Sequence, residues 1–473
     1  MKLGLIRGSL PRYLPHEHNV WGAAEAAVGA LCDAEGASLF VLPDIPMDGR
    51  QTLTALDQCR AEGVDYVLLL HGGFTMGDVA RTVAASEFRA GFWAVPEPTL
   101  SGDIQLNSFV SLNMSLSIAR QVRDRAARPV QWYHGAPDSP ALQDRLRHTI
   151  RAIKAAKSLF GARIGVIGGL AMTFYNMETS TSELRARIGV EVAHHDIHEL
   201  TGRMAAQDAG RVAAEVVAMG QAAEILGVSE TQMALTAQAA LSLKDMANEG
   251  EYAALAVADW PALQENPGMH PGAAFSWLEE TSHIPVAAEG DVLGAVTQLV
   301  AKSLTGRVGY LLDMAEPDLE SRKLLMWHAG GGPLYLADDD GARWVNHPTI
   351  TRGDPDPVDV GTISELVFRD GPASVFRITR NAHAVFAMEG NIVAHDQTGY
   401  IGCRGWMDGF RMDGTNVSME DVVSTVMAHG IEHHFVLVPG GIAATLTEFS
   451  GWTGMQMLEP KRMRDHLNAP DMT

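Results

Sequence analysis

Hydrophobic and polar positions alternate in two different ways along this chain. In the first half, short apolar runs such as "KLGLI", "VDYVLLLHGG" and "ARIGVIGGLAM" are followed by longer segments in which apolar residues recur at helical spacing. Buried strands that alternate with amphipathic helices are typical of parallel sheets covered by helices. The pattern therefore predicts an α/β fold for this part of the chain.

Changes in this pattern predict three domains. A polar, Arg-rich helix is expected near residues 144–158, and a fresh buried strand follows it, so we place a boundary near Leu159. The second α/β unit continues through two long helical patterns. From Leu334 onward, period-2 alternation and frequent Gly, Pro and Asp predict antiparallel β structure. The predicted domains are 1–158, 159–306 and 307–473.

Two acidic residues, Glu289 and Asp313, each end an apolar run. The segments "HIPVAA" and "RVGYLLD" suit buried strands, and a helix is predicted between them, with Asp291 as its N-cap. We expect one strand–helix–strand crossover that brings both acids to the carboxyl edge of a parallel sheet. Two carboxylates in a poorly solvated cleft repel each other unless a cation lies between them. The alternative is that each is an ordinary solvated acid at a strand end.

A third group lies in "SMEDVVSTVMAHGIEHHFVLVPGG". Ser418 is predicted to cap a helix that stops at Gly430, and His433 and His434 follow where a strand begins. Adjacent side chains on a strand point to opposite faces, so at most one of the two should face a given site. The alternative for either is a hydrogen-bonded core histidine. Two carboxylates plus one imidazole suit a divalent ion such as Mn²⁺.

Composition and charge exclude several classes of protein. The 473 residues are 46% hydrophobic, which is enough for large cores, and the net charge of −21 comes without a basic cluster that would follow a phosphate backbone. Nucleic acid and membrane partners are therefore not expected. The 3 cysteines have neither disulfide-framework nor zinc-site spacing. We expect a cytoplasmic protein.

The motifs around these residues resemble the L-fucose isomerase and L-arabinose isomerase superfamily, most closely its L-fucose isomerase branch. The resemblance rests on "AAEGDVLGAVTQLVAKSLTG" with the acid of "YLLD" beyond it, on "VIGGLAM" followed by "GVEVAHHDIHEL", and on "VMAHGIEHHFVLV", in that order and spacing. It implies two Rossmann-like α/β domains followed by a C-terminal antiparallel β-rich domain. This agrees with the partition predicted from the pattern.

The same resemblance implies the roles of the site residues. Glu289, Asp313 and His434 would hold one Mn²⁺, or another divalent cation such as Mg²⁺ or Co²⁺. Glu289 and Asp313 would also be the catalytic acid/base pair, which moves a proton between C1 and C2 of an open-chain sugar through a cis-enediol. A homo-oligomer, either a trimer or a hexamer, is implied as well.

Five further residues are expected to contact the substrate or to support the ligands. His328 lies where arabinose-type enzymes have an additional metal-site histidine, and Met172 matches a substrate-contacting methionine of the fucose branch. Arg7 follows the first strand, where it suits a polar end of the substrate. The full set is His328, Met172, Arg7, Trp406 and His433. For each of them, a purely structural role is the alternative.

Three functions are compatible with this sequence. The first is a metal-dependent aldose/ketose isomerase acting on a pentose or 6-deoxyhexose. The second uses the same enediol chemistry for another reaction, such as decarboxylation of a keto-sugar acid, because Asp259 and Trp260 depart from the fucose-type pattern and imply a different sugar pocket. The third is a non-catalytic sugar-binding protein. The two acids and the histidine argue against the third, since binding alone does not need them.

Overall fold

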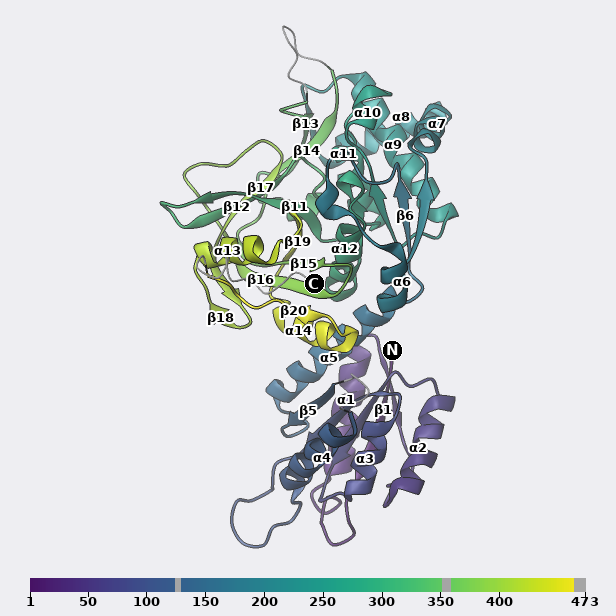
Figure 1. Cartoon of the computed structure of the whole chain (residues 1–473), viewed down its shortest axis with the longest axis vertical. Helices are drawn as coiled ribbons and strands as arrows, with labels where there is room; N and C mark the ends of the chain where they lie inside the picture. Colours follow the sequence, from purple (N-terminus) through teal and green to yellow (C-terminus); the bar gives the residue numbers. More distant parts are fainter. Residues whose placement is uncertain (124–128, 351–358, 463–473) are drawn as a thin grey trace. The chain divides into compact units, whose positions relative to one another are not determined.

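The chain divides into two compact units in the computed structural model, which describes residues 1–123, 129–350 and 359–462 (Figure 1). Unit 1 comprises Met1–Lys154 with Gly451–Gly454, and unit 2 comprises Ala155–Ser450 with Met455–Thr473. The division falls within the predicted Arg-rich helix, close to the predicted boundary. The finer division of the remainder into two domains stays a prediction.

Unit 1 is an α/β layer structure built on a parallel sheet. Its strand order is β2-β1-β3-β4-β5, and each neighbouring pair is parallel. The apolar runs form these strands because their side chains are buried on both faces, as β3 illustrates throughout its length. The strands are β1 (Lys2–Gly8), β2 (Ser38–Val41), β3 (Tyr66–His71), β4 (Arg89–Ala94) and β5 (Val130–His134). The helices are α1 (Val20–Ala34), α2 (Gly49–Ala61), α3 (Gly77–Ala85), α4 (Ser108–Arg123) and α5 (Pro140–Leu159).

Unit 2 begins with a second parallel sheet, of order β10-β9-β6-β7. Its strands are β6 (Arg163–Ile167), β7 (Glu191–His195), β9 (Ala254–Val257) and β10 (Val286–Ala287). The helices of this region are α6 (Thr181–Ile188), α7 (Ile197–Ala205), α8 (Ala209–Ala222), α9 (Glu230–Glu249), α10 (Ala262–Glu265), α11 (Gly272–Ser282) and α12 (Val292–Thr305). The first of the two long helical patterns predicted for the second α/β unit corresponds to α8, which lies between the end of α7 and a short strand.

The β-rich remainder of unit 2 is a large sheet in which six strands form a closed ring. Each neighbour in the ring pairs antiparallel, and β17 closes it by pairing with β16. In order, the ring strands are β16 (Ala384–Val393), β15 (Gly371–Thr379), β19 (His434–Pro439), β11 (Tyr310–Asp318), β12 (Lys323–His328) and β17 (Cys403–Met412). Closure removes the exposed strand edges within the ring.

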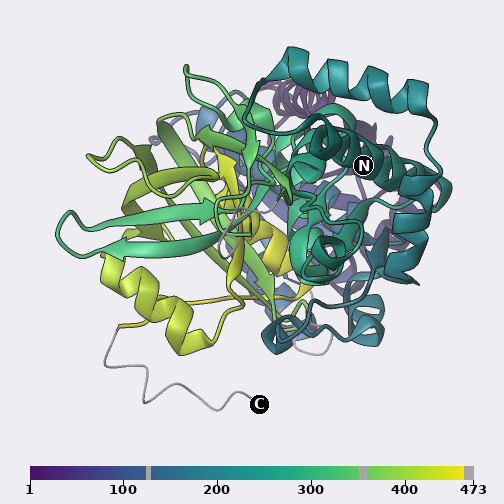
Figure 2. The same ribbon diagram turned by 90° about the horizontal axis from the view of Figure 1, so that it is seen from above.

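Additional strands make the whole sheet mixed, whereas the sequence predicted antiparallel structure. Three parallel pairings join β8 to β13, β14 to β17 and β20 to β16. The added strands are β8 (Glu224–Leu226), β13 (Arg343–Asn346), β14 (Thr362–Val367), β18 (Thr415–Asn416) and β20 (Gln456–Met457). Helices α13 (Met419–His429) and α14 (Ala443–Thr453) complete the fold. Figure 2 shows the green and yellow strands on one side of unit 2 and the teal helices on the other.

The predicted crossover between the two acids is wrong. Strand β10 belongs to the four-stranded parallel sheet, but β11 pairs antiparallel with β19 and β12 in the ring. Both strands are buried and apolar, so the pattern alone does not reveal which sheet each one joins. Helix α12 therefore connects two different sheets, and it packs against β15 and β19 as well as β9.

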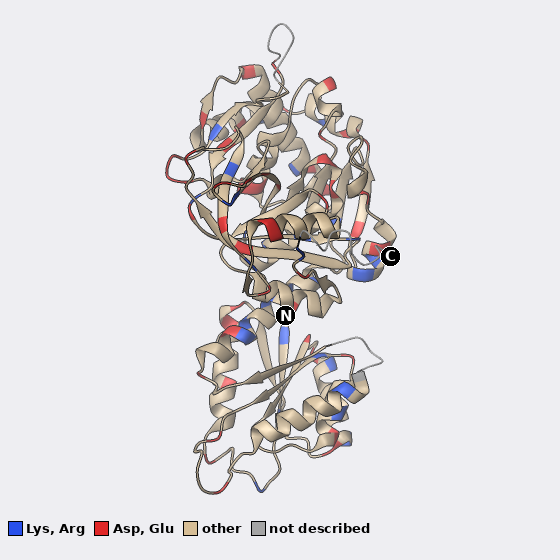
Figure 3. Ribbon diagram, turned by 60° about the vertical axis from the view of Figure 1, so that its left-hand side comes forward, with Lys and Arg blue, Asp and Glu red and all other residues tan. Residues whose placement is uncertain are grey.

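Charged residues are spread over both units, with acidic positions more frequent than basic ones (Figure 3). None of the helices in the described part of the chain combines the length and the apolar character that crossing a bilayer requires.

Candidate active site

Asp313 and His434 face each other across the β11–β19 ladder. The next pair in register, Leu312 and Phe435, packs in the hydrophobic core of the β region, so side-chain alternation puts the polar pair on the opposite face. His434 Nε2 lies 4.0 Å from Asp313 Oδ1. The ladder thus brings together two of the three predicted ligands.

Glu289 reaches the same place from the parallel sheet. It lies in the turn Ala288–Gly290 after β10, with a left-handed φ of 60°. Such a conformation is costly for a residue with a side chain and persists only when its surroundings hold it. The Glu289 N–H donates to Asp259 Oδ1 at 2.6 Å, and its carbonyl accepts from Ala171 N–H at 2.9 Å. Glu289 Oε2 lies 3.5 Å from His434 Nε2, so His434 lies near both predicted acidic ligands, Glu289 and Asp313.

Both histidines of the pair lie beside Glu289, which corrects the prediction that at most one would face the site. His433 Nε2 is 3.3 Å from the same Glu289 oxygen that approaches His434. The alternation rule fails here because His433 precedes β19, which begins at His434. A residue outside the strand is not bound by the strand's alternation.

Hydrogen bonds distinguish the two imidazoles. Asn176 Nδ2 donates to His433 Nδ1 at 3.1 Å, which leaves Nε2–H of His433 to donate to Glu289. In His434 the arrangement is reversed, because Nδ1–H donates to Asp291 Oδ2 at 3.0 Å. The Nε2 lone pair of His434 therefore points toward the acids. This arrangement makes His434 the better ligand and His433 a hydrogen-bond donor.

The donor set fits a divalent cation. Two clusters can each converge on an ion, Glu289–His433–His434 and Asp313–His328–His434, and they share His434. Among the described residues, the buried atoms Asp313 Oδ1 and His434 Nε2 have no hydrogen-bond partner. Carboxylate oxygens with imidazole nitrogens are ligands that ions such as Mn²⁺ accept. The residues present therefore match the chemistry that the resemblance implies.

Neighbouring charges set the protonation of these groups. Burial by itself would raise the pKa of Glu289, but the hydrogen bond from His433 and the nearby imidazoles lower it. Burial would lower the pKa of His434, but the Asp291 hydrogen bond and the surrounding carboxylates raise it. In Asp291, burial is outweighed by the charge of Arg377, which holds the pKa well below its usual range. Glu289 and Asp291 are thus carboxylates at neutral pH.

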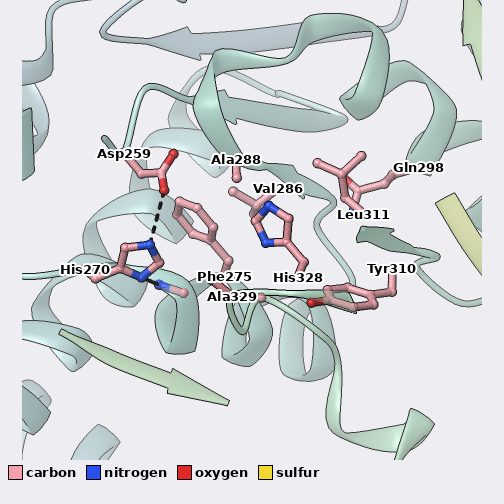
Figure 4. Close-up of a pocket in the computed structure, with 12 residues that line it drawn as sticks. Asp259, His270, Phe275, Val286, Ala288, Gln298, Tyr310, Leu311, His328 and Ala329 are labelled. Atoms are coloured by element: carbon pink, nitrogen blue, oxygen red, sulfur yellow. Dashed lines mark hydrogen bonds and ion pairs between the residues drawn. The ribbon is translucent and has the colours of Figure 1, made fainter. Parts of the chain in front are cut away.

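His328 lies beside the ligands and also lines a neighbouring pocket. Its ring centroid is 5.4 Å from that of His434, and burial lowers its pKa, which favours the neutral imidazole. Figure 4 shows the pocket, with His328 in its middle and Asp259 and His270 on one side. Asp259 Oδ2 lies 3.6 Å from His270 Nε2, and burial raises the pKa of Asp259 to about 7. Asp259 therefore connects this pocket with the backbone of Glu289.

Aromatic and sulfur-containing side chains border the site. Phe174 lies with its ring centroid 5.4 Å from His433 and 6.2 Å from Trp260. Trp260 remains 39% exposed, and Met172, which follows the residue bound to the Glu289 carbonyl, is 60% exposed. Such accessible apolar side chains suit contacts with a sugar.

Arg7 and Trp406 have partners where they lie. In unit 1, Arg7 lies within β1, and not after the first strand as expected from the sequence, because β1 extends to Gly8. It forms an ion pair with Glu25 at 3.2 Å and donates to the carbonyl groups of Leu42 and Pro43. Trp406 donates from Nε1 to the Gln397 carbonyl at 2.6 Å, and its ring stacks on His395. These contacts account for both side chains structurally, and their roles toward a substrate stay predictions.

Sequence reasoning missed Arg377 and underestimated Asp291. Asp291 does cap α12 as predicted, since its Oδ1 accepts from Gly294 N–H at 2.8 Å. It also binds His434 and the buried guanidinium of Arg377, so a capping role alone is an incomplete description. The signal for capping was local, whereas these partners lie in strands far along the chain. Phe174 and Asn176 were missed for the same reason.

Comparison with known proteins adds the nature of the reaction. No family model matches the chain. A sulfoquinovose isomerase from Priestia aryabhattai is 25% identical over 406 residues, which cover 83% of this chain and 85% of that protein. A sulfoquinovose isomerase from Alkalicoccus urumqiensis is 26% identical over 377 residues, which cover 78% and 79% of the two chains. One from Clostridium sp. is 24% identical over 322 residues, which cover 65% and 69%.

The protein is a ketol-isomerase. The similarity extends over most of this isomerase and supports membership among the sugar aldose–ketose isomerases, whereas the L-fucose branch stays a prediction. It confirms the expectation of an enzyme and removes the support for a non-catalytic sugar-binding protein. It is also consistent with a small sugar as the substrate of the isomerase.

Proposed function

We propose that the protein is a metal-dependent aldose/ketose isomerase that acts on a pentose or 6-deoxyhexose through a cis-enediol. The observation that carries the proposal is the convergence of Glu289, Asp313 and His434 from two sheets, with Nε2 of His434 between the two acids. Acids gathered around one imidazole nitrogen are costly unless a cation balances their charge.

Glu289, Asp313 and His434 would hold one divalent cation, such as Mn²⁺, Mg²⁺ or Co²⁺. His434 supports this set because it belongs to both ligand clusters, one with Glu289 and the other with Asp313 and His328, so His328 would be a further ligand. When bound, the ion supplies a Lewis acid that stabilises the negative charge developing on the sugar oxygens. The neutral state favoured for His328 and the Nδ1–H form of His434 both leave a nitrogen lone pair for such a role.

The proton transfers fall to the carboxylates. In the aldose-to-ketose direction, the C2–H bond breaks, its electron pair forms the C1–C2 double bond of the enediol, and the proton goes to a carboxylate. Glu289 suits this step because its lowered pKa keeps it ionised and because His433 Nε2–H orients its Oε2. The π electron pair of the C1 carbonyl moves to O1, which takes up a proton to complete the enediol. Loss of the O2 proton then forms the C2 carbonyl while a proton returns to C1, with Asp313 as the second carboxylate of the pair.

The 6-deoxyhexose is the favoured substrate class. The relatives are named for sulfoquinovose, a 6-deoxyglucose that bears a sulfonate at C6. Phe174, which lies beside His433, and Trp260, which lies beside Phe174, would face the carbon chain of such a sugar. We therefore propose a 6-deoxyhexose, with a sulfonated one as the first candidate to be tested.

Isotope exchange tests this function directly. The Mn²⁺-loaded protein is incubated in D₂O with sulfoquinovose, L-fucose and L-arabinose, and the recovered sugars are analysed by NMR. We expect deuterium at C2 of the aldose together with formation of the ketose for at least one sugar. Failure of every sugar to exchange would overturn the proposal, and CO₂ release from a keto-sugar acid would favour decarboxylation instead.

A cytoplasmic homo-oligomer completes the proposal. Light scattering at low micromolar concentration should show at least a trimer, and a monomer of 50.9 kDa would contradict it.

A further inference from the structure

The carboxylate of Asp291 joins a helix terminus to the site histidine. Its Oδ1 accepts from Gly294 N–H and thereby caps α12, while its Oδ2 accepts from Nδ1–H of His434 at 3.0 Å. Asp291 and His434 are both fully buried, so water does not compete for these hydrogen bonds. The start of α12 and the ring of His434 are therefore held by one side chain.

Arg377 of β15 fixes this carboxylate from the other side. Its two terminal nitrogens donate to the two oxygens of Asp291, Nη2 to Oδ1 at 2.9 Å and Nη1 to Oδ2. The guanidinium is fully buried, and its Nε lies 3.7 Å from Glu432 Oε2. A two-point ion pair defines the plane of the carboxylate as well as its position. Because burying an ion pair carries a desolvation cost, stability alone is a weak explanation for this arrangement.

We propose that Asp291 and Arg377 are positioning residues that hold His434 in the Nδ1–H tautomer and thereby keep its Nε2 lone pair directed at Glu289 and Asp313. The inference rests on the proposed function, since a lone pair in this place serves a cation. Carboxylates that accept the second N–H of a metal-binding histidine commonly fix its tautomer and ring orientation. Arg377 acts through Asp291, which it keeps as an acceptor on both oxygens.

The neighbouring histidine shows that the partner decides the tautomer. His433 accepts at Nδ1 from Asn176 and carries its proton on Nε2, the opposite of His434. The two adjacent histidines thus have different protonation sites because an amide faces Nδ1 of His433 and a carboxylate faces Nδ1 of His434. Replacing the carboxylate of Asp291 by an amide should therefore move the proton of His434 from Nδ1 to Nε2, as in His433.

The substitution Asp291→Asn makes that exchange while preserving the cap. Arg377 donates at both positions, but the second donor differs: at Oδ1 it is Gly294 N–H, which can only donate, and at Oδ2 it is His434, whose ring can accept instead. The amide oxygen should therefore stay at the Oδ1 position. The nitrogen then takes the Oδ2 position and donates to Nδ1 of His434. The proton of the imidazole must move to Nε2, which removes the lone pair. Asn and Asp are about equally good N-caps, so α12 should be unaffected.

The decisive measurement is the tautomer of His434 in metal-free protein labelled with ¹⁵N-histidine, at a pH where the imidazole is neutral. Long-range ¹H–¹⁵N correlation distinguishes Nδ1–H from Nε2–H, and His434→Gln assigns the signal. We expect Nδ1–H in the wild type and Nε2–H in Asp291→Asn. In parallel, calorimetric titration with Mn²⁺ should show affinity weakened by about 10- to 100-fold in the variant.

Asp208→Asn is the matched control, because Asp208 caps α8 through Arg211 N–H in the same way. It should change neither His434 nor Mn²⁺ affinity. An Nε2–H tautomer in the wild type, which requires no variant to fold, or an unchanged Nδ1–H tautomer in Asp291→Asn, would overturn the inference. A tautomer switch in a protein whose wild type binds no Mn²⁺ would uphold the positioning role and reject the metal-dependent function.

Discussion

Gly290 packs directly against the carbonyl oxygen of Gly169: a Cβ atom added to Gly290 would lie 2.0 Å from that oxygen. Gly290 also has a φ of +73°, which disfavours side chains. We predict that Gly290→Ala displaces the turn that carries Glu289, so that Mn²⁺ affinity and turnover both fall by at least tenfold. Calorimetry and initial rates provide the measurement.

The control for this change is Gly306→Ala. Gly306 ends α12 with a similar φ of +77°, but nothing lies within 4 Å of its added Cβ. This variant should lose about 1 kcal/mol of unfolding free energy from backbone strain and keep normal activity. Equal activity losses in both variants would attribute the effect to strain and not to the position of Glu289.

Removing the negative charge of Glu289 tests whether this residue is a metal ligand and catalytic base or only a structural acid. Glu289→Gln keeps the size of the side chain but loses the negative charge, so Mn²⁺ affinity should weaken. Turnover at saturating Mn²⁺ should still fall by about 10²- to 10⁴-fold, the usual contribution of a positioned base. Glu230→Gln, an exposed position on α9, serves as the control and should behave as the wild type. Normal turnover of Glu289→Gln at full occupancy would reject the assignment.

The sequence described the geometry of the candidate ligands less well than it selected them. His434 was chosen over His433 from the family resemblance, whereas Glu289 and Asp313 were selected because each ends an apolar run, which is a local property. Their convergence was derived from a crossover that does not exist, since β10 and β11 lie in different sheets. The sheet that a strand joins depends on which distant strand forms hydrogen bonds with it. An apolar run in the sequence does not indicate that partner.

Helix ends were predicted correctly because capping depends on residues that are close in sequence. Ser418 caps α13 by accepting from Asp421 N–H, and Gly430 ends it in the left-handed conformation, both as predicted. Asp291 caps α12 as predicted too, but its partners His434 and Arg377 come from strands that are remote in sequence. The polar environment that supports the ligands could therefore not be predicted from local patterns.

Glu279 should make stability depend on pH. It is buried, accepts from Val286 N–H and from Gln298, and burial raises its pKa well above the usual 4.5. The native state thus retains a proton that the unfolded chain releases above about pH 4.5, so this residue's contribution to stability falls as pH rises from there to the native pKa. Glu279→Gln keeps the accepting oxygen and cannot ionise.

We therefore expect Glu279→Gln to be more stable than the wild type in alkaline solution, with an advantage that shrinks as pH is lowered. Urea unfolding at several pH values between acidic and alkaline conditions measures it. The exposed substitution Glu230→Gln should show no such trend. A constant difference between Glu279→Gln and the wild type across the range would mean that Glu279 is ionised in the native state.

Trp260 should affect substrate binding more than chemistry. Its ring is 39% exposed and lies beside Phe174, which in turn contacts His433. Trp260→Ala should raise KM by about fivefold with a smaller change in kcat, because an apolar contact of this kind contributes about 1 kcal/mol to binding. Phe160→Ala, which removes a ring that is 82% exposed, should leave both constants unchanged. A fall in kcat alone would instead place Trp260 in the catalytic step.

The three proposed ligands come from two different sheets, which should affect how the site selects ions by their radius. Asp313 and His434 are paired in one backbone ladder, so their separation is nearly fixed. The distance from this pair to Glu289 depends instead on how α12 packs between β9 and the strands β15 and β19. Metal–oxygen distances differ by about 0.3 Å between a small divalent ion such as Mg²⁺ and a large one such as Ca²⁺. We expect that buried residues of α12 such as Val296 and Val300, which bind no ion, determine which ions fit.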